Sequence, residues 1–269
     1  MSTSLAYMTS APVTPRPAAT VLLVRDHPRP QPGRSPLQVF LQQRVTQMAF
    51  AGGMTVFPGG GVDAGDRPDP DHWTGPEPRW WAERLGVEVD LAGALVHAAV
   101  RETFEECGVL LAGPGTPADL HRHRADVVAR RRSFADLLVA AGLVLRADLL
   151  HAWARWITPL GSPRRYDTVF FVAQVPEGQL ADAHTTEAVE ARWWHPDEAL
   201  ERWRDEEIRL MAPTVRTLQE IAECGESAAV LAAAPERVIR PIVPVVRRDG
   251  DRLVSVLPDD TAYPAIGLA

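Results

Sequence analysis

The segment at residues 91–108 constrains the fold of this chain more than any other. It contains no proline, and Gly108 stands where a helix would end, so the sequence predicts one long helix. Glu102, Glu105 and Glu106 follow the spacing i, i+3, i+4, which places three carboxylates on one helix face. An apolar stripe lies on the other side, formed by Val96, Val100, Thr103, Phe104 and Cys107. We expect the helix to bury this stripe and to direct the three carboxylates outward.

Three neighbouring carboxylates repel one another unless a positive charge lies among them. The chain contains no lysine, because all 28 of its basic residues are arginines. A divalent cation is the natural neutraliser, and oxygen ligands favour Mg²⁺ or Mn²⁺. The alternative is a solvated acidic face, which is the commoner meaning of this pattern taken alone. The glycine-rich turn at 57–60, followed by Asp66, favours the metal, since glycine lets a backbone carbonyl approach an ion closely.

The remaining elements predict a single α/β domain. The chain has 269 residues, 46% of them hydrophobic, which is enough for a sizeable core. Alternating or buried apolar runs predict strands at 19–25, 37–44, 55–57, 152–158, 168–175 and 188–194. Helices are expected at 80–85, 91–108, 118–131, 133–141, 196–207 and 213–224. A hairpin at 242–247 and 252–257 closes the chain.

Composition excludes several other classes of protein. No apolar run reaches the ~20 residues that a membrane-spanning helix needs, and the first residues lack the pattern of a signal peptide. Two cysteines, Cys107 and Cys224, cannot build a disulfide framework. A net charge of −7 disfavours non-specific binding to nucleic acid. We therefore expect a cytoplasmic protein that binds neither nucleic acid nor membranes.

Two stretches of the sequence together resemble the Nudix box, G-x5-E-x7-R-E-U-x-E-E-x-G-U, where U is aliphatic. Gly60 and Asp66 match its opening, with Asp in place of Glu, and 101–109 matches its second half, with Thr103 at the first U. Here 34 residues separate Asp66 from Arg101, where the box has seven. A branch of this superfamily resembling peroxisomal coenzyme A diphosphatases carries such an insertion, between FPGG-x-x-D-x-x-D and RETFEE-x-G-V-L-L.

This resemblance implies an α/β Nudix fold, in which a mixed β-sheet is sandwiched between α-helices, with an insertion inside the box and a C-terminal extension. We accordingly expect a flexible tail at 1–16 and a Nudix hydrolase domain at 17–212. The insertion would occupy 67–92. Residues 213–269 would form a helical and hairpin extension packed on the domain.

The resemblance also implies a metal-dependent hydrolase that cleaves the diphosphate bond of a nucleoside diphosphate linked to another group. Glu102, Glu105 and Glu106 would hold two or three divalent cations, Mg²⁺ or Mn²⁺, and the carbonyl of Gly60 would be a further ligand. Arg101 would orient the glutamates through salt bridges.

The general base differs among members of the superfamily, so this role stays open. The candidate bases are Glu102, Glu105, Glu187 and Glu190.

The segment before the box indicates which substrate to expect. Coenzyme A enzymes of the superfamily often carry L-L-T-x-R-S-x-x-L-x-x-H-x-G-x-x-x-F-P-G-G. Leu41, Arg44 and Gly53 match this pattern, whereas Gln42, Val45 and Ala51 do not. Arg44 would bind a substrate phosphate as a bidentate fork, although a surface salt bridge explains an arginine there equally well. Gly59 and Arg165 are expected to be further substrate contacts.

Several functions therefore stay open within and beyond the hydrolase class. Coenzyme A or an acyl-CoA is the first expectation for the small-molecule nucleotide substrate, and ADP-ribose or NADH is the alternative. A Nudix-fold sensor that binds a nucleotide without turning it over is a third interpretation. A homodimer is common in the superfamily and is possible here.

Overall fold

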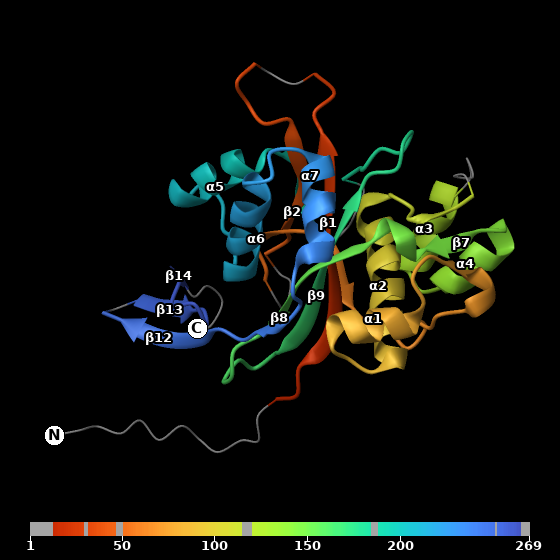
Figure 1. Ribbon diagram of the computed structural model, residues 1–269, viewed down its shortest axis with the longest axis horizontal. Coiled ribbons are helices and arrows are strands. Elements are labelled where there is room, and N and C mark those ends of the chain that lie inside the picture. The colour runs from red at the N-terminus through yellow and green to blue at the C-terminus, as the bar shows by residue number, and fades with distance from the viewer. Residues whose placement is uncertain are drawn as a thin grey trace.

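The computed structural model describes residues 13–29, 32–46, 51–114, 120–183, 188–250 and 252–264 (Figure 1). Its centre is an eight-stranded sheet with the order β10-β2-β1-β9-β8-β11, in which β3 also pairs with β2 and β4 with β1. These strands are β1 (Arg16–Asp26), β2 (Leu37–Arg44), β3 (Thr55–Val56), β4 (Gly59–Gly61), β8 (His151–Ile157), β9 (Tyr166–Gln174), β10 (Ala188–Trp194) and β11 (Pro241–Ile242). Because β1 runs parallel to β9 but antiparallel to β2, the sheet is mixed, as expected.

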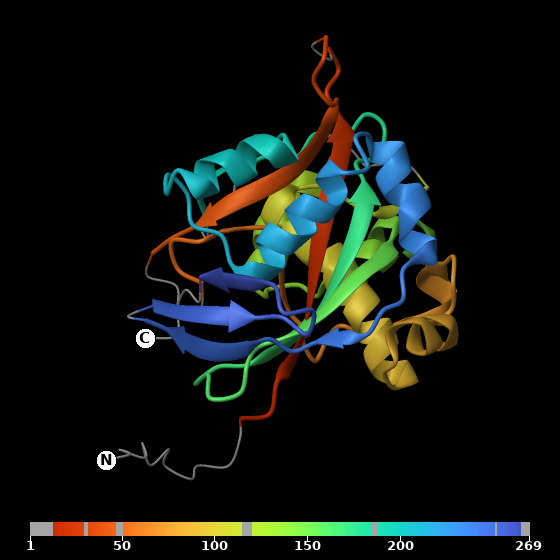
Figure 2. The same cartoon turned by 60° about the vertical axis from the view of Figure 1, so that its left-hand side comes forward.

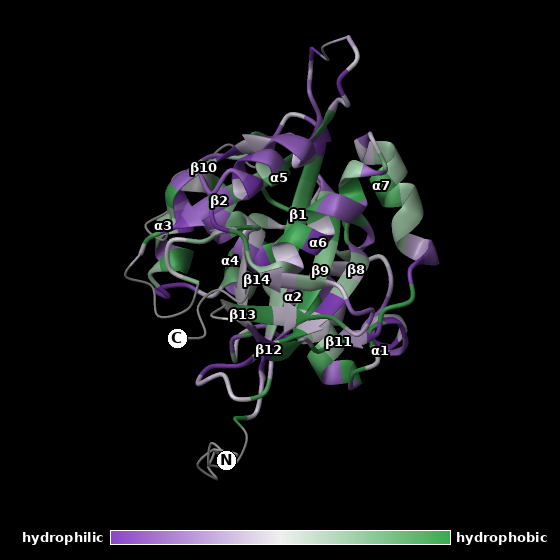
Figure 3. Cartoon of the chain, turned by 90° about the vertical axis from the view of Figure 1, so that its left-hand side faces the viewer, coloured by the Kyte–Doolittle hydropathy of each residue, from purple (hydrophilic) through white to green (hydrophobic). Residues whose placement is uncertain are grey.

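Strand β1 lies in the middle of this sheet and is deeply buried along its second half. Val21, Leu22, Leu23 and Val24 have no exposed surface, which is the pattern of a strand covered on both faces. Figure 3 shows β1 and β9 as green, apolar ribbons in the interior, whereas α5 at the surface is mostly purple.

Helices cover both faces of the sheet (Figures 1 and 2). Among the described residues, the helices of one side are α1 (Pro78–Leu85), α2 (Val89–Cys107), α3 (Leu120–Val128) and α4 (Phe134–Ala141). Those of the other side are α5 (Pro196–Arg204), α6 (Ala212–Ala222) and α7 (Ser227–Ala233). Each side has its own cluster of buried apolar residues. The predicted sandwich of a mixed sheet between helices is therefore confirmed.

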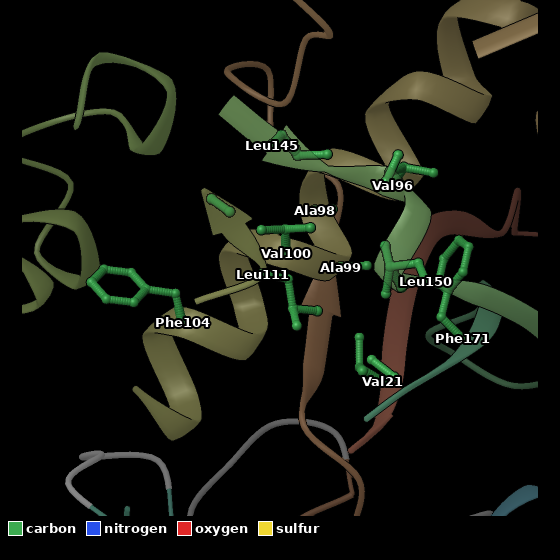
Figure 4. Packing of buried hydrophobic residues seen from close by; sticks show 14 of the residues in the cluster. Val21, Val96, Ala98, Ala99, Val100, Phe104, Leu111, Leu145, Leu150 and Phe171 are labelled. Carbon is green, nitrogen blue, oxygen red and sulfur yellow. The ribbon is translucent and has the colours of Figure 1, made fainter. Parts of the chain in front are cut away.

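Helix α2 carries the larger of these clusters. Val96, Val100 and Phe104 have no exposed surface and join a cluster that includes Val21 of β1 and Phe171 of β9 (Figure 4). The helix ends at Gly108, which adopts the left-handed conformation with φ 69° and donates its N–H to the carbonyl of Phe104. The sequence predicted both the apolar stripe and the residue that ends the helix.

The prediction that α2 directs its carboxylates outward was wrong. Glu106 is only 4% exposed, and the side chains of Glu102 and Glu105 are 13% and 18% exposed. Strand β4 lies against the face of α2 that carries the carboxylates, while the apolar stripe on the other face packs into the core. The carboxylates consequently face the interior of a polar site.

The insertion within the box is a folded part of the domain. It contains a 3₁₀ turn at Pro70–His72, the short strand β5 (Trp73–Thr74) and helix α1. Trp81 and Leu85 of α1 are fully buried in the same cluster as α2. Pro68 packs so closely on Gly93 that a Cβ there would lie 2.6 Å from its Cγ atom. This contact explains why a glycine is present within the first turns of α2.

Two small sheets complete the structure. Strand β5 pairs with β7 (Val144–Arg146), which also pairs with β6 (Ala112–Gly113). The predicted C-terminal hairpin is present as β12 (Val245–Asp249) and β13 (Arg252–Val256), with β14 (Ala262–Pro264) as a third strand.

The C-terminal segment after residue 212 reaches the main fold in two ways. Val215 and Leu218 of α6 are buried in the cluster on the second side of the sheet. Strand β11 extends the main sheet by pairing with β8. None of the helices in the described ranges is both long and apolar enough to cross a membrane.

Candidate active site

A glycine turn brings the backbone directly against helix α2. After β3 the chain turns back, and Gly59–Gly61 pair as β4 with residues 18–20 of β1. A Cβ on Gly59 would overlap the backbone of Ala19 and Thr20, and one on Gly60 would overlap the carboxylate of Glu102. Gly59 therefore requires a glycine, since backbone atoms occupy the space of a side chain, and a side chain at Gly60 would displace the carboxylate of Glu102.

Arg101 is the centre of the site. It is 6% exposed, and its guanidinium binds Asp66 twice, through Nε to Oδ1 and through Nη2 to Oδ2, both at 2.8 Å. Its Nη1 donates to Oε1 of Glu102 at 2.7 Å and to Oε1 of Glu105 at 3.1 Å. Its Nη2 also reaches the carbonyl of Gly61 at 2.9 Å. One arginine therefore ties the first half of the box to the second across the insertion.

Asp66 has a second partner in His97. The Nδ1 atom of His97 lies 2.8 Å from Oδ1 of Asp66, and both residues are buried. Burial alone would raise the pKa of Asp66, but the hydrogen bonds from Arg101 and His97 outweigh it and bring this pKa to about 2. Asp66 is consequently a fixed negative charge on the inner side of Arg101.

The two glutamates that contact Arg101 have raised pKa values, in contrast to the lowered pKa of Asp66. Burial raises the pKa of Glu102 to about 7, and the neighbouring charge of Glu105 adds to this effect although Arg101 opposes it. Burial likewise raises the pKa of Glu105, against the attraction of Arg101. One guanidinium thus offsets only part of the negative charge in the cluster.

Glu106, on the same helix face, is held by different partners. Its Oε2 accepts a hydrogen bond from Nε2 of Gln42 at 2.6 Å and another from the backbone N–H of Gly59 at 2.7 Å. Both Glu106 and Gln42 are buried, with exposed fractions of 4% and 1%. A carboxylate that accepts two short bonds in a buried site is fixed in one orientation.

The donor set fits a hard divalent cation. It consists of three carboxylates on adjacent turns of one helix, beside a turn whose Gly60 leaves room for no side chain. Burial is the main cause of the raised pKa values of Glu102 and Glu105, and a nearby cation would favour their ionised forms. Within the described ranges, no three acidic, histidine or cysteine side chains already converge on one point. Glu102, Glu105, Glu106 and the carbonyl of Gly60 are the groups that would hold such an ion.

Other predicted site residues lie around this cluster or outside it. Glu187 lies outside the described residues. Glu190 is exposed and pairs with Arg192 at 3.1 Å. Arg44 ends β2, where it lies opposite Ala188, the first described residue of β10. Arg165 is buried, and its guanidinium donates to the carbonyls of Thr158 at 3.0 Å and Val13 at 2.9 Å.

Sequence reasoning missed His97 and Gln42 as members of the site. His97 stands one helical turn before Arg101, so a helical pattern that looked for polar residues on the face of Arg101 would have found it. Gln42 gives no comparable signal, because its partner Glu106 is 64 residues away in the chain.

The fold and the site together define the class of protein. A mixed sheet between helices, a glycine turn against an acidic helix, and an arginine that binds the box glutamates are the features of a Nudix hydrolase. Comparisons with known proteins make this assignment specific: a family model described as the NUDT19 Nudix domain matches residues 81–221. The chain belongs to this family of Nudix hydrolases, whose members generally use a divalent metal ion.

Individual relatives agree with the family. The chain is 30% identical to a human protein named acyl-coenzyme A diphosphatase NUDT19, in a match over 92% of this chain and 80% of that protein. It is 27% identical to the protein of the same name from Gallus gallus, over 93% and 80% of the two chains. Among solved structures, a NUDIX hydrolase from Alicyclobacillus acidocaldarius is similar, with a TM-score of 0.65 and 27% identity over 81% of this chain and 96% of that one.

Proposed function

We propose that this protein is a Mg²⁺- or Mn²⁺-dependent diphosphatase whose substrate is coenzyme A or an acyl-CoA. The observation that carries this proposal is the match to the human acyl-coenzyme A diphosphatase over 92% of the chain, with all three glutamates of the second half of the box present. Hydrolysis of the diphosphate would release adenosine 3′,5′-bisphosphate and 4′-phosphopantetheine or its acylated form. The oxygen of the attacking water becomes part of the phosphate group whose phosphorus atom it attacks.

Glu102, Glu105 and Glu106, with the carbonyl of Gly60, are the proposed ligands of the divalent ions. Bound to these groups, a divalent ion polarises a diphosphate and lowers the pKa of a water molecule. Glu106 is the ligand fixed most firmly by the protein, since its Oε2 already accepts bonds from Gln42 and Gly59.

Arg101 acts by positioning in this proposal. Its bonds to Oε1 of Glu102 and of Glu105 set the rotamers of both side chains, and its two bonds to Asp66 fix the guanidinium itself. Because all five donors of an arginine are arranged in a rigid plane, this geometry holds two glutamates at once.

The remaining roles concern the proton and the phosphates. Glu105, Glu102 and Glu187 are the carboxylates that we propose as acceptors of the proton from the attacking water. Arg44 is the proposed fork for a substrate phosphate, and the turn at Gly59 would contact the diphosphate. Arg165 is a further proposed substrate contact, and its guanidinium also donates to the backbone carbonyls of Thr158 and Val13.

A substrate panel tests the proposal. Purified protein is incubated with Mg²⁺ or Mn²⁺ and with CoA, acetyl-CoA, a longer acyl-CoA, ADP-ribose, NADH and a dinucleoside polyphosphate, and the products are identified by mass spectrometry. Release of 4′-phosphopantetheine from CoA or its acylated form from an acyl-CoA supports the proposal. If AMP formed from ADP-ribose or NADH and CoA compounds were not cleaved, the proposed substrate would be wrong, but the protein would still be a diphosphatase. Binding of Mn²⁺ without any turnover would favour a nucleotide sensor.

A further inference from the structure

Gln42 lies inside the site although it belongs to no Nudix motif. It is a residue of β2, paired in register with Val56 of β3 and with Ala191 of β10, and it is 1% exposed. Its Nε2 donates to Oε2 of Glu106 at 2.6 Å. The orientation of this amide is fixed chemically, because the carboxylate can only accept a hydrogen bond from the NH₂ group.

The other end of the same amide has an unusual environment. The Oε1 atom of Gln42 is buried, and no donor among the described residues reaches it. A buried amide oxygen without a donor is costly, so native proteins satisfy nearly all such atoms. A hydrogen-bond donor bound at the site would satisfy this atom.

We propose that Gln42 is a positioning residue for the metal centre, with one function at each end of its amide. Its NH₂ group holds Glu106 in the orientation of a ligand, and its carbonyl oxygen accepts a hydrogen bond from a water molecule bound to the cation. This inference rests on the proposed function, because it requires a divalent ion at Glu106. Partners that hold metal-ligating groups commonly change metal affinity 10- to 100-fold when they are removed.

Gln38 is a matched control on the same strand. It lies four residues before Gln42, so both side chains project from the same face of β2. It is also buried, with an exposed fraction of 6%, and its Oε1 accepts a hydrogen bond from Nε of Arg25 at 3.0 Å. Gln38 thus makes a bond to a charged group without touching the box.

Mn²⁺ affinity is the readout that separates positioning from packing. Wild type, Gln42→Met and Gln38→Met are titrated with Mn²⁺, and free ion is measured by electron paramagnetic resonance, with circular dichroism as the test of folding. We expect Gln42→Met to bind Mn²⁺ about 10-fold or more weakly than wild type, and Gln38→Met to bind it as wild type does. Wild-type affinity in Gln42→Met would overturn the inference and leave the proposed function intact. Absence of Mn²⁺ binding by wild type would overturn both.

A second variant covers the case in which Gln42→Met does not fold. Gln42→Asn retains an amide but shortens the side chain by one methylene, so its NH₂ group is withdrawn from Glu106. We expect the same loss of Mn²⁺ affinity. A crystal structure of the wild type with Mn²⁺ then tests the carbonyl end: a metal-bound water within hydrogen-bond distance of Oε1 of Gln42 is expected. An Oε1 atom that contacts only protein would overturn that part.

Discussion

Arg101 binds Asp66 through two parallel hydrogen bonds of 2.8 Å, although an insertion of folded structure separates the two residues in the chain. The insertion leaves the box after Asp66 and returns through α1 to the start of α2. Because α1 and α2 share one apolar cluster, the two ends of the insertion are held together, and the box closes as it would without one. Substitution of Arg101, which joins the two halves of the box, is therefore the first test.

Arg101→Lys should lower both stability and activity. Lysine retains the charge but cannot bind Asp66 with two donors while also reaching Glu102 and Glu105. We expect the free energy of unfolding, measured by urea denaturation, to fall by about 2–4 kcal/mol, since the partners are buried. The control is Arg131→Lys, which changes an exposed pair with Asp126 and should cost less than about 1 kcal/mol. Equal losses in the two variants would contradict the role of Arg101.

The lowered pKa of Asp66 predicts that the free energy of unfolding decreases at acidic pH. Its pKa is about 2 in the folded chain, against an ordinary value of 3.8, so its ionised form stabilises the fold above pH ~4. This stabilisation is lost as the pH falls from about 4 through 2. Between pH 4.5 and 2, the wild type should lose about 2 kcal/mol more than Asp66→Asn in urea denaturation. Parallel curves for the two proteins would show that Asp66 is not held ionised.

Gly60→Ala should strongly lower turnover without unfolding the protein. The added Cβ would overlap the carboxylate of Glu102, which must then leave its position beside Arg101. We expect kcat to fall about 100-fold or more, in an assay with saturating Mg²⁺. Gly65→Ala is the control, because a Cβ at that glycine meets no atom within 4 Å. Normal turnover by Gly60→Ala would remove the glycine turn from the mechanism.

Neighbouring tryptophans of the insertion should differ sharply in their effect on stability. Trp81 has no exposed surface and contacts Phe171 edge to face, with ring centroids 5.6 Å apart, whereas Trp80 is 48% exposed. Trp81→Ala should reduce the free energy of unfolding by about 3–5 kcal/mol. Trp80→Ala should change it by less than about 1 kcal/mol. If both substitutions were tolerated, the insertion would not be part of the core.

Elements with a strong local pattern were predictable from the sequence. The bounds of β2 and β10 agree with the predicted 37–44 and 188–194, and α2 was recognised from its spacing and its final glycine. Strand β4 was not expected, because three consecutive glycines have low strand propensity. Its pairing depends on β1, which lies far away in the sequence.

The site was predictable only in part, and for a related reason. Helical spacing placed Glu102, Glu105 and Glu106 on one face, but it cannot show that β4 covers this face. The link from Asp66 to Arg101 followed from resemblance to the Nudix box, since 34 intervening residues hide it from any local pattern. Gln42 was noted only as a mismatch to a substrate motif, because its contact with Glu106 forms in the folded chain.

Hydrolysis of an acyl-CoA by wild type and Glu106→Gln, with Mg²⁺ or Mn²⁺ present, tests the central claim most directly. Wild type should release acyl-4′-phosphopantetheine, identified by mass spectrometry, and no product should form when the metal is chelated. Glu106→Gln should lower kcat by about 100-fold or more while its circular dichroism stays that of wild type, because a metal ligand is lost. Near-normal turnover by a folded Glu106→Gln, or metal-independent release by wild type, would contradict the account.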